Sequence, residues 1–249
     1  MKKIITSTLL ASALATSVSA DFLGAEVGYA AWAPKTTGDI KYSAQGSKIN
    51  FEDDLGYEGT DLNGFAWAYF DHFIPLIPNV KVQQTNYSSS QAHTVTTNFT
   101  FKTTDYAPTN NITTDLVLNQ KDIILYWRIL DNWVNLDLGF MGKQIDGSMS
   151  ITRGSDVNSV DFTTTVPLAY IKARFDLPFS GLSVEADYST VSYLGNSITD
   201  MKGGVVYESS FGLGAVAGIK KQNITLDDID AIYADIDIEG VYAGLFFHF

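Results

Sequence analysis

The chain has 249 residues and no cysteine, and its 16 lysines and arginines against 28 aspartates and glutamates give a formal charge of −12. Without cysteine there can be no disulfide framework, thiolate metal site, iron–sulfur cluster or catalytic thiol. The acidic balance repels phosphate backbones, so we expect no nucleic-acid partner, and an aromatic content of 13% excludes a disordered chain.

The amino-terminal segment is organised like a secretory signal peptide. Lys2 and Lys3 form a basic start, residues 4–18 are apolar or small, and Ser19 and Ala20 are small residues of the kind that a signal peptidase reads. A transmembrane anchor is less favoured, because the run is short and rich in Ser and Thr. We therefore predict a cleaved signal peptide over residues 1–20 and one domain over residues 21–249.

The remainder of the chain alternates between apolar and polar residues with the period of a β-strand. The clearest apolar rows are Val241, Ala243, Leu245, Phe247 and Phe249; Leu182, Val184, Ala186 and Tyr188; and Val134, Leu136, Leu138 and Phe140. No stretch offers the roughly 18 continuous apolar residues of a membrane-spanning helix. A membrane protein built from this domain must therefore be a closed barrel.

The pattern predicts ten strands, over residues 23–33, 63–71, 80–87, 122–128, 134–141, 166–177, 182–189, 199–207, 211–220 and 240–249. Long polar connections are expected at 34–60, 88–113, 144–164 and 222–234, and they alternate with short turns. Such alternation is typical of a closed antiparallel up-and-down transmembrane β-barrel. Eight strands is the alternative count, because residues 80–87 are too polar to show a clean apolar face.

A soluble lipocalin-like barrel or a sandwich would show the same alternation with its faces reversed. Three features favour a membrane barrel: aromatic residues lie near strand ends, small residues fall on the polar face, and the chain ends on an apolar strand. We therefore expect the apolar rows to face lipid and the polar rows to face the lumen.

Two motifs resemble known outer-membrane proteins. The last strand, GVYAGLFFHF, resembles the terminal strand by which bacterial outer-membrane barrels are handed to their assembly machinery, which implies an assembly signal at Leu245, Phe247 and Phe249. The glycines Gly203 and Gly204, together with the start LGAEVGYAAWAP, resemble a proteobacterial family of outer-membrane β-barrel proteins named for a GlyGly motif. The resemblance implies the outer membrane of a Gram-negative bacterium and no established catalytic residues.

Strand parity places charges of both signs on the lumen face. The predicted lumen charges are Glu26, Asp137, Lys172, Arg174, Glu185, Asp187, Lys202 and Lys220. Both signs in a small volume favour paired charges that fill the barrel, since narrow barrels are just filled by side chains. We expect a structural or surface-interaction protein, with a narrow passive channel for small solutes or ions as the alternative.

Acidic residues cluster in two predicted loops that become neighbours when a barrel closes. Weak candidates for a divalent cation are Asp53, Asp54, Asp227, Asp228 and Asp230, although a solvated acidic rim is the simpler interpretation. Contact with lipopolysaccharide through such cations is the sharper hypothesis. We expect no cofactor.

Catalysis is the least supported function. His72 lies in a predicted periplasmic turn and His248 beside the terminal residue. His93 lies in a predicted long extracellular loop near Ser88, Ser89 and Ser90. A hydrolase would need a histidine fixed beside a carboxylate or a serine. We therefore expect no enzyme, with an outer-membrane hydrolase or a soluble lipocalin-like binding protein as the remaining alternatives.

Overall fold

The computed structural model describes residues 23–44, 46–229 and 231–249. The predicted signal peptide lies outside these residues. Within them no helix is long and apolar enough to cross a membrane.

The described residues form fourteen antiparallel strands. Their bounds are β1 (Leu23–Tyr42), β2 (Ile49–Asn50), β3 (Asn63–His72), β4 (Asn79–Asn86), β5 (Ser88–Thr94), β6 (Phe99–Phe101), β7 (Thr104–Tyr106), β8 (Asn111–Asp131), β9 (Val134–Arg153), β10 (Asp156–Leu177), β11 (Leu182–Tyr193), β12 (Asn196–Glu208), β13 (Leu213–Ile229) and β14 (Ile232–His248).

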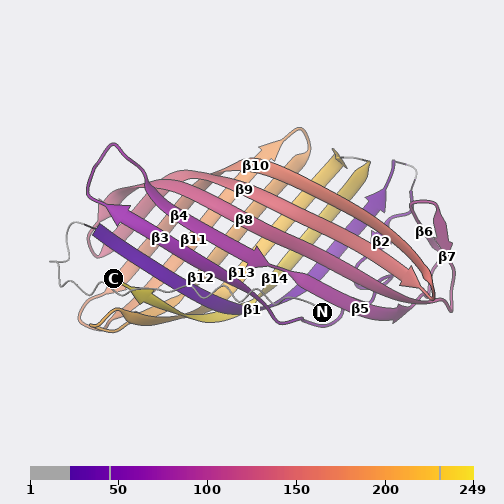
Figure 1. Ribbon diagram of the computed structural model, residues 1–249, viewed down its shortest axis with the longest axis horizontal. Coiled ribbons are helices and arrows are strands. Elements are labelled where there is room, and N and C mark those ends of the chain that lie inside the picture. The colour runs from indigo at the N-terminus through magenta and orange to yellow at the C-terminus, as the bar shows by residue number, and fades with distance from the viewer. Residues whose placement is uncertain (1–22, 45, 230) are drawn as a thin grey trace, which may run out of the picture.

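Eleven of these strands make the ten-stranded wall of a barrel (Figure 1). Consecutive wall strands pair with each other, and β14 pairs with β1 along their length, which closes the sheet. β4 and β5 are two parts of one wall strand, because Thr85 opposite Gln120 and Ser88 opposite Val117 keep the same register on β8. The prediction of ten strands is confirmed, and the alternative count of eight is wrong.

The barrel has two different ends. We call the end that holds Leu23 and Phe249 the base, and the opposite end the top. Short connections at 73–78, 132–133, 178–181 and 209–212 lie at the base, on the left of Figure 1. The top carries the connections 43–62 and 95–110, which include β2 and the β6–β7 hairpin, and the short connections that follow β9, β11 and β13.

The predicted long loops at 144–164 and 222–234 are wrong, because both segments are mostly strand. β9 continues to Arg153 before β10 starts at Asp156, and β13 continues to Ile229 before β14 starts at Ile232. In the same way β1 extends to Tyr42, and β5 and the start of β8 occupy part of 88–113. The Ser, Thr and Asp residues that suggested loops are the outward rows of these strands, where water is the neighbour.

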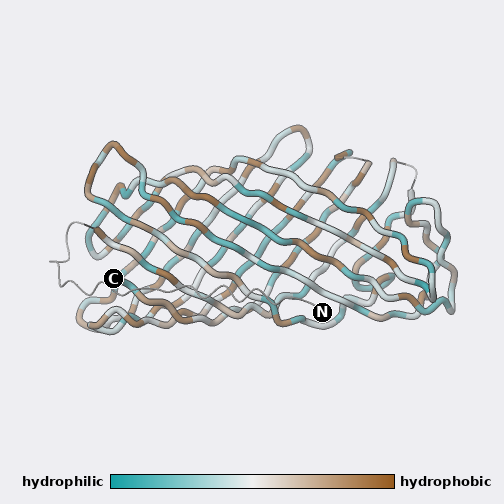
Figure 2. The backbone as a smooth tube through the Cα atoms, in the orientation of Figure 1, coloured by the Kyte–Doolittle hydropathy of each residue, from teal (hydrophilic) through white to brown (hydrophobic). Residues whose placement is uncertain are grey.

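The two faces of the sheet exchange their polarity along the barrel. On β14 the outward row is apolar near the base and acidic near the top; its members are Phe247, Leu245, Ala243 and Val241, then Glu239, Asp237 and Asp235. The inward row near the top is buried and apolar, with Ile238, Ile236, Ala234 and Ile232. Apolar and polar residues alternate along the strands in Figure 2.

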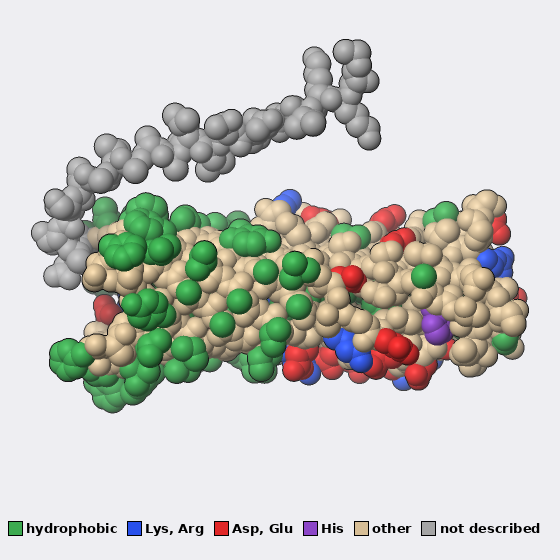
Figure 3. Space-filling model, turned by 90° about the horizontal axis from the view of Figure 1, so that it is seen from below, with side chains coloured by type: hydrophobic (Ala, Val, Ile, Leu, Met, Phe, Trp, Pro, Cys, Tyr) green, Lys and Arg blue, Asp and Glu red, His purple; other side chains and the backbone are tan. Residues whose placement is uncertain are grey.

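The other strands change polarity in the same sense. On β9 the inward row holds Asp137 and Lys143 near the base, then Ile145, Met149 and Ile151 near the top. Figure 3 shows hydrophobic side chains gathered over the base half and acidic and basic ones over the top half. An apolar outer belt suits hydrocarbon, whereas a polar outer surface over an apolar interior suits water. The base half is therefore the membrane-spanning part of the barrel.

This assignment predicts that a charge placed on the outward row destabilises the barrel in the base half but not in the top half. Ala186, in the middle of the belt on β11, is exposed and flanked by Val184 and Tyr188. Ala186→Arg should cost about 2–4 kcal/mol of unfolding free energy in lipid vesicles, because the arginine would face the bilayer interior.

The matched control is Ser148→Arg, on the outward row of β9 in the top half. This arginine would face water, so the change should stay within about 0.5 kcal/mol. Equal losses for the two variants, measured by urea unfolding in vesicles, would contradict the placement of the belt.

Candidate functional site

The lumen of the base half is lined by charges that pair across the barrel. At the lowest level Arg128 contacts Asp71 at 2.7 Å and Asp137 at 3.3 Å. Arg174 contacts Asp176 at 2.7 Å and Glu208 at 3.7 Å. These residues come from five strands, so the pairs connect the wall from inside.

A second level lies above it. Lys172 contacts Glu185 at 3.0 Å between the neighbouring strands β10 and β11. Asp187 contacts Lys202 at 3.0 Å and Lys81, across the lumen on β4, at 3.2 Å. Sequence reasoning missed Lys81, although its position between the outward Val80 and Val82 would have identified it as a lumen residue.

A third level centres on Lys143, whose side chain is 1% exposed. Its ammonium group contacts Asp122 at 2.8 Å and Asp200 at 2.9 Å, and it donates a hydrogen bond of 2.8 Å to Gln120. Gln222 on β13 bonds Gln120 across the lumen. Carboxylates and amides from three strands thus surround one ammonium group at the upper limit of the charged lumen.

The predicted lumen charges all point inward in the structure. Among them Glu26 is held by neutral donors, since it accepts hydrogen bonds from Trp67 Nε1 at 2.6 Å and from the Tyr69 hydroxyl at 3.0 Å. Lys220 lies 3.9 Å from Asp200 and also faces the Trp32 ring at 4.8 Å from its centroid.

Space in the lumen shrinks from the base upward. A cavity of about 720 Å³ opens at the base and reaches Lys172 and Arg174. Two further cavities, one beside Glu185 and one beside Lys220, hold about 20 and 30 Å³. Volumes of this size hold one or two water molecules. The charged side chains therefore fill most of the lumen above the cavity at the base.

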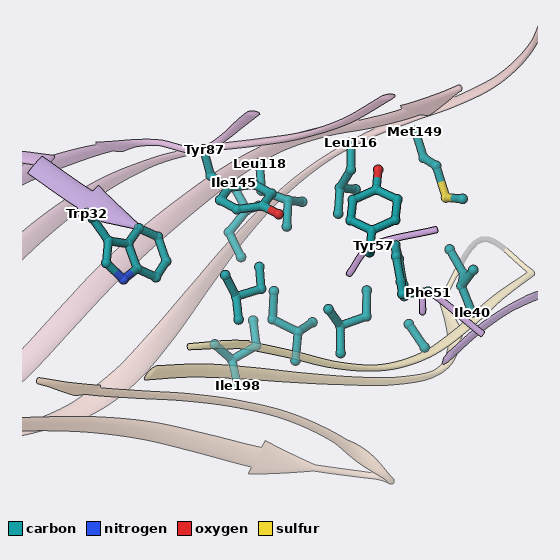
Figure 4. Packing of buried hydrophobic residues seen from close by; sticks show 14 of the residues in the cluster. Trp32, Ile40, Phe51, Tyr57, Tyr87, Leu116, Leu118, Ile145, Met149 and Ile198 are labelled. Atoms are coloured by element: carbon teal, nitrogen blue, oxygen red, sulfur yellow. The ribbon is translucent and has the colours of Figure 1, made fainter. Parts of the chain in front are cut away.

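The upper lumen is closed by an apolar core (Figure 4). We call residues 49–57, which follow β1, the plug segment; its Ile49, Phe51, Leu55 and Tyr57 are each at most 2% exposed. Phe51 and Tyr57 meet edge to face at 5.2 Å, and the Tyr57 hydroxyl donates to the Thr114 carbonyl at 3.3 Å. Burial raises the pKa of Tyr57 well above its ordinary value. The predicted polar loop 34–60 thus contributes a hydrophobic plug.

The β6–β7 hairpin covers the top of this core. Phe99 stacks on Tyr106 at 5.0 Å, and Phe101 is 1% exposed. The Lys102 ammonium group donates to the Ser159 carbonyl on β10 at 2.7 Å. The hairpin therefore fastens to the wall as well as to the core beneath it.

The acidic candidates for a cation do not gather. Asp54 accepts a hydrogen bond from the Asn50 N–H at 2.8 Å, the Asp53 N–H donates to Asn50 Oδ1, and the Asp227 N–H donates to Asn196 Oδ1. Asp228 lies at the exposed end of β13, and Asp230 lies outside the described residues. Among the described residues no group of three or more such side chains could hold a metal ion.

The histidine and serines weighed for catalysis do not form a catalytic pair. His93 points inward from β5 and its Nε2 is buried without a hydrogen-bond partner. Ser89 instead donates to Asp61 at 2.5 Å, and Gln91 donates to the same carboxylate oxygen at 3.0 Å. His72 and His248 lie at the base.

The residues of the predicted assembly signal lie on the outside of the base. Leu245 and Phe249 are 63% and 66% exposed, and Phe247 packs edge to face on Phe249 at 4.8 Å. The Phe249 N–H donates to the Ala25 carbonyl at 2.8 Å, which fixes the end of the chain to β1. The terminal strand therefore presents an apolar row at the closing seam.

No family model matches the chain, and no curated protein matches it. Solved structures do match. The outer membrane protease OmpT from Escherichia coli has a TM-score of 0.57 at 10% identity, covering 92% of this chain and 97% of that chain. Ail, the attachment invasion locus protein of Yersinia pestis, has a TM-score of 0.42 at 11% identity, covering 92% of this chain and 100% of that chain. The likeness to OmpT shows an outer-membrane β-barrel fold, as the alternation of residues predicts.

The ion pair between Lys172 and Glu185 offers a test of the lumen network. Glu185→Gln should cost about 3 kcal/mol, because it leaves a buried ammonium group without its counter-charge. Adding Lys172→Met should recover part of that loss, since the unpaired charge is then gone. Urea unfolding of the two single variants and the double variant gives the coupling; additive losses would show that the two side chains do not interact.

Proposed function

We propose that the protein is an integral outer-membrane barrel of a Gram-negative bacterium that does not conduct and that serves a structural or surface-interaction role. The observation that carries this proposal is the filled lumen, closed by charged side chains within the belt and by the plug segment above it. In this orientation the base faces the periplasm and the top faces the outside.

The shape of the top supports a role at the surface. The strands continue well beyond the apolar belt, and their outward rows carry Ser, Thr, Asp and Lys residues on a rigid wall. A pore needs no such extension, whereas a protein that meets partners outside the membrane gains a fixed, water-exposed surface from it. This placement implies three partners: membrane lipid around the belt, lipopolysaccharide around the top, and the assembly machinery.

A narrow passive channel is the second candidate, and the cavity of about 720 Å³ at the base is the observation that favours it. Conduction would require the levels around Asp187 and Lys143 and the plug segment to open together. An enzyme is the weakest candidate, because His93 forms no hydrogen bond through Nε2.

Membership of the GlyGly family remains a proposal that rests on the two glycines. Gly204 faces the lumen on β12, where a Cβ would come within 2.6 Å of the Tyr242 hydroxyl and of the Ala217 carbonyl oxygen. Gly203 faces outward, where a Cβ would make only an ordinary contact of 3.8 Å with the Glu185 carbonyl oxygen. Packing against Tyr242 thus explains the second glycine of the pair.

Because its lumen is filled, we expect the protein not to conduct ions in planar bilayers. Purified protein whose gel migration changes on heating, which shows that it is folded, should give no discrete openings, while a wide porin in the same bilayers conducts. Stable openings in proportion to the amount of folded protein would overturn the non-conducting barrel and favour the channel.

Deletion of the terminal residue should affect assembly in cells and stability of the folded protein to different extents. Deleting Phe249 should lower the amount inserted in cells far more than it lowers the unfolding free energy of refolded protein, because the residue lies exposed at the seam. Phe179→Ala, at a base turn where the side chain is even more exposed, is the control and should insert normally. Equal losses in both assays after deletion of Phe249 would assign that residue to packing rather than assembly.

A further inference from the structure

The wall of the barrel is incomplete near the top, between β10 and β11. β10 pairs with β9 from Asp156 to Phe175 but pairs with β11 only from Ala169 to Leu177. β11 turns back at residues 194–195, well short of the top of β10, as Figure 1 shows. No strand among the described residues pairs with residues 156–168 on the side away from β9.

Two hydrogen bonds show which main-chain groups face this open side. The Asp176 N–H donates to the Trp133 carbonyl at the β9 side, and the Ser159 carbonyl accepts from Lys102 on the opposite side. Successive residues of a strand address opposite neighbours. The odd-numbered residues of β10 therefore direct their N–H and C=O groups to the open side. On the base side of the Lys102 contact, these odd-numbered residues are Asp161, Thr163 and Thr165.

Pro167 explains why the pairing stops. It is odd-numbered, so its nitrogen, which carries no hydrogen, faces β11 at the place where the ladder ends. We call residues 159–167 the β10 edge. The contact of Lys102 with Ser159 limits the β10 edge toward the top, and Pro167 limits it toward the base. An extended segment of a few residues fits between these limits.

The side chains around the β10 edge have two characters. Its inward residues Val160, Phe162 and Val166 are only partly buried and pack on the apolar core, as does Val191 on β11. Its outward neighbourhood is acidic: Asp161 on β10, Asp146 on β9 and Asp115 on β8 all face out, and none forms an ion pair with a described residue. An added strand would meet apolar surface on one side and negative charge on the other.

We propose that the β10 edge is a docking site for an extended peptide segment of another protein, which adds to the sheet as an antiparallel strand. Its side chains would alternate between apolar residues facing inward and lysine or arginine facing outward. The inference rests on the proposed function as a surface-interaction protein and names the class of partner.

A second copy of this chain fits the β10 edge poorly. Two copies in one membrane are related by an axis along the membrane normal. Because barrel strands tilt by about 35–45°, the two β10 edges would cross at roughly 70–90° and could not form a ladder. The acidic outward rows would also repel each other. A peptide is free to align with the strand.

The test uses the protein in detergent micelles and a fluorescent nine-residue peptide of alternating Val and Lys. Saturable binding is expected. A peptide with Glu in place of Lys should not bind, and a peptide N-methylated at the lysines should bind about tenfold more weakly, because those N–H groups face β10 in an antiparallel pair. Binding by the N-methylated peptide as tight as by the parent would overturn the proposal.

Protein variants test the same contact from the other side. Thr163→Pro removes an N–H of the β10 edge but none that bonds β9, so it should weaken binding about tenfold. Thr163→Val is the matched control, because both variants lose the hydrogen bond of Thr163 to Asp146 while only proline lacks the N–H. If Thr163→Pro does not fold, the N-methylated peptide on the native protein gives the same test.

Three results would overturn the docking site: no saturable binding at millimolar peptide, unchanged binding by folded Thr163→Pro, or self-association of the protein that Thr163→Pro abolishes. The last would assign the β10 edge to a second copy. These outcomes are independent of conductance, so a failed docking site leaves the non-conducting barrel intact, and channel openings leave the docking site intact.

Discussion

The wall of this barrel is a single sheet, so every strand must suit the medium outside it and the lumen inside it at each height. Near the base the outside is apolar and the inside carries charge, and near the top the two are exchanged. This change in polarity fixes the height of the membrane on the barrel. It also decides what can fill the lumen at each level.

Within the belt, charged residues can face only the lumen, and a charge in so narrow a space needs a counter-charge nearby. The pairs of Arg128, Asp187 and Lys143 meet that need at three heights. Above the belt, water surrounds the wall, and the lumen becomes an ordinary hydrophobic core around Phe51 and Tyr57. Paired charges and a hydrophobic core thus fill one lumen at different heights, and the proposed non-conducting role rests on both.

The sequence predicts much of this architecture because a strand with one apolar face has an unmistakable period. Residues 134–141, 182–189 and 240–249 lie in the belt, where the contrast between lipid and lumen is greatest, and all but the terminal Phe249 are in strands in the structure. The upper parts of β9 and β13 were predicted as loops, because Ser, Thr and Asp on a water-facing row have the composition of a loop. Their inward Ile145, Met149 and Ile224 held the missing signal.

The plug segment and the acidic candidates were beyond sequence reasoning for a different reason. Ile49, Phe51 and Leu55 have no strand period, and only the closed wall gives them an interior to fill. Asp53 and Asp227 have separate hydrogen-bond partners, because Asn50 and Asn196 fix their local turns independently. Such arrangements depend on how distant segments meet, which a pattern along one strand does not contain.

The placement of the membrane can be measured directly on the outward row of β14. Because the chain has no native cysteine, single cysteines at Asp235, Asp237, Glu239, Val241, Ala243 and Leu245 can each carry a nitroxide label in lipid vesicles. Collisions with oxygen should dominate at 241–245 and collisions with a water-soluble nickel chelate at 235–239, with the change near residue 240. Uniform access of the nickel chelate along the whole row would contradict a membrane belt at the base.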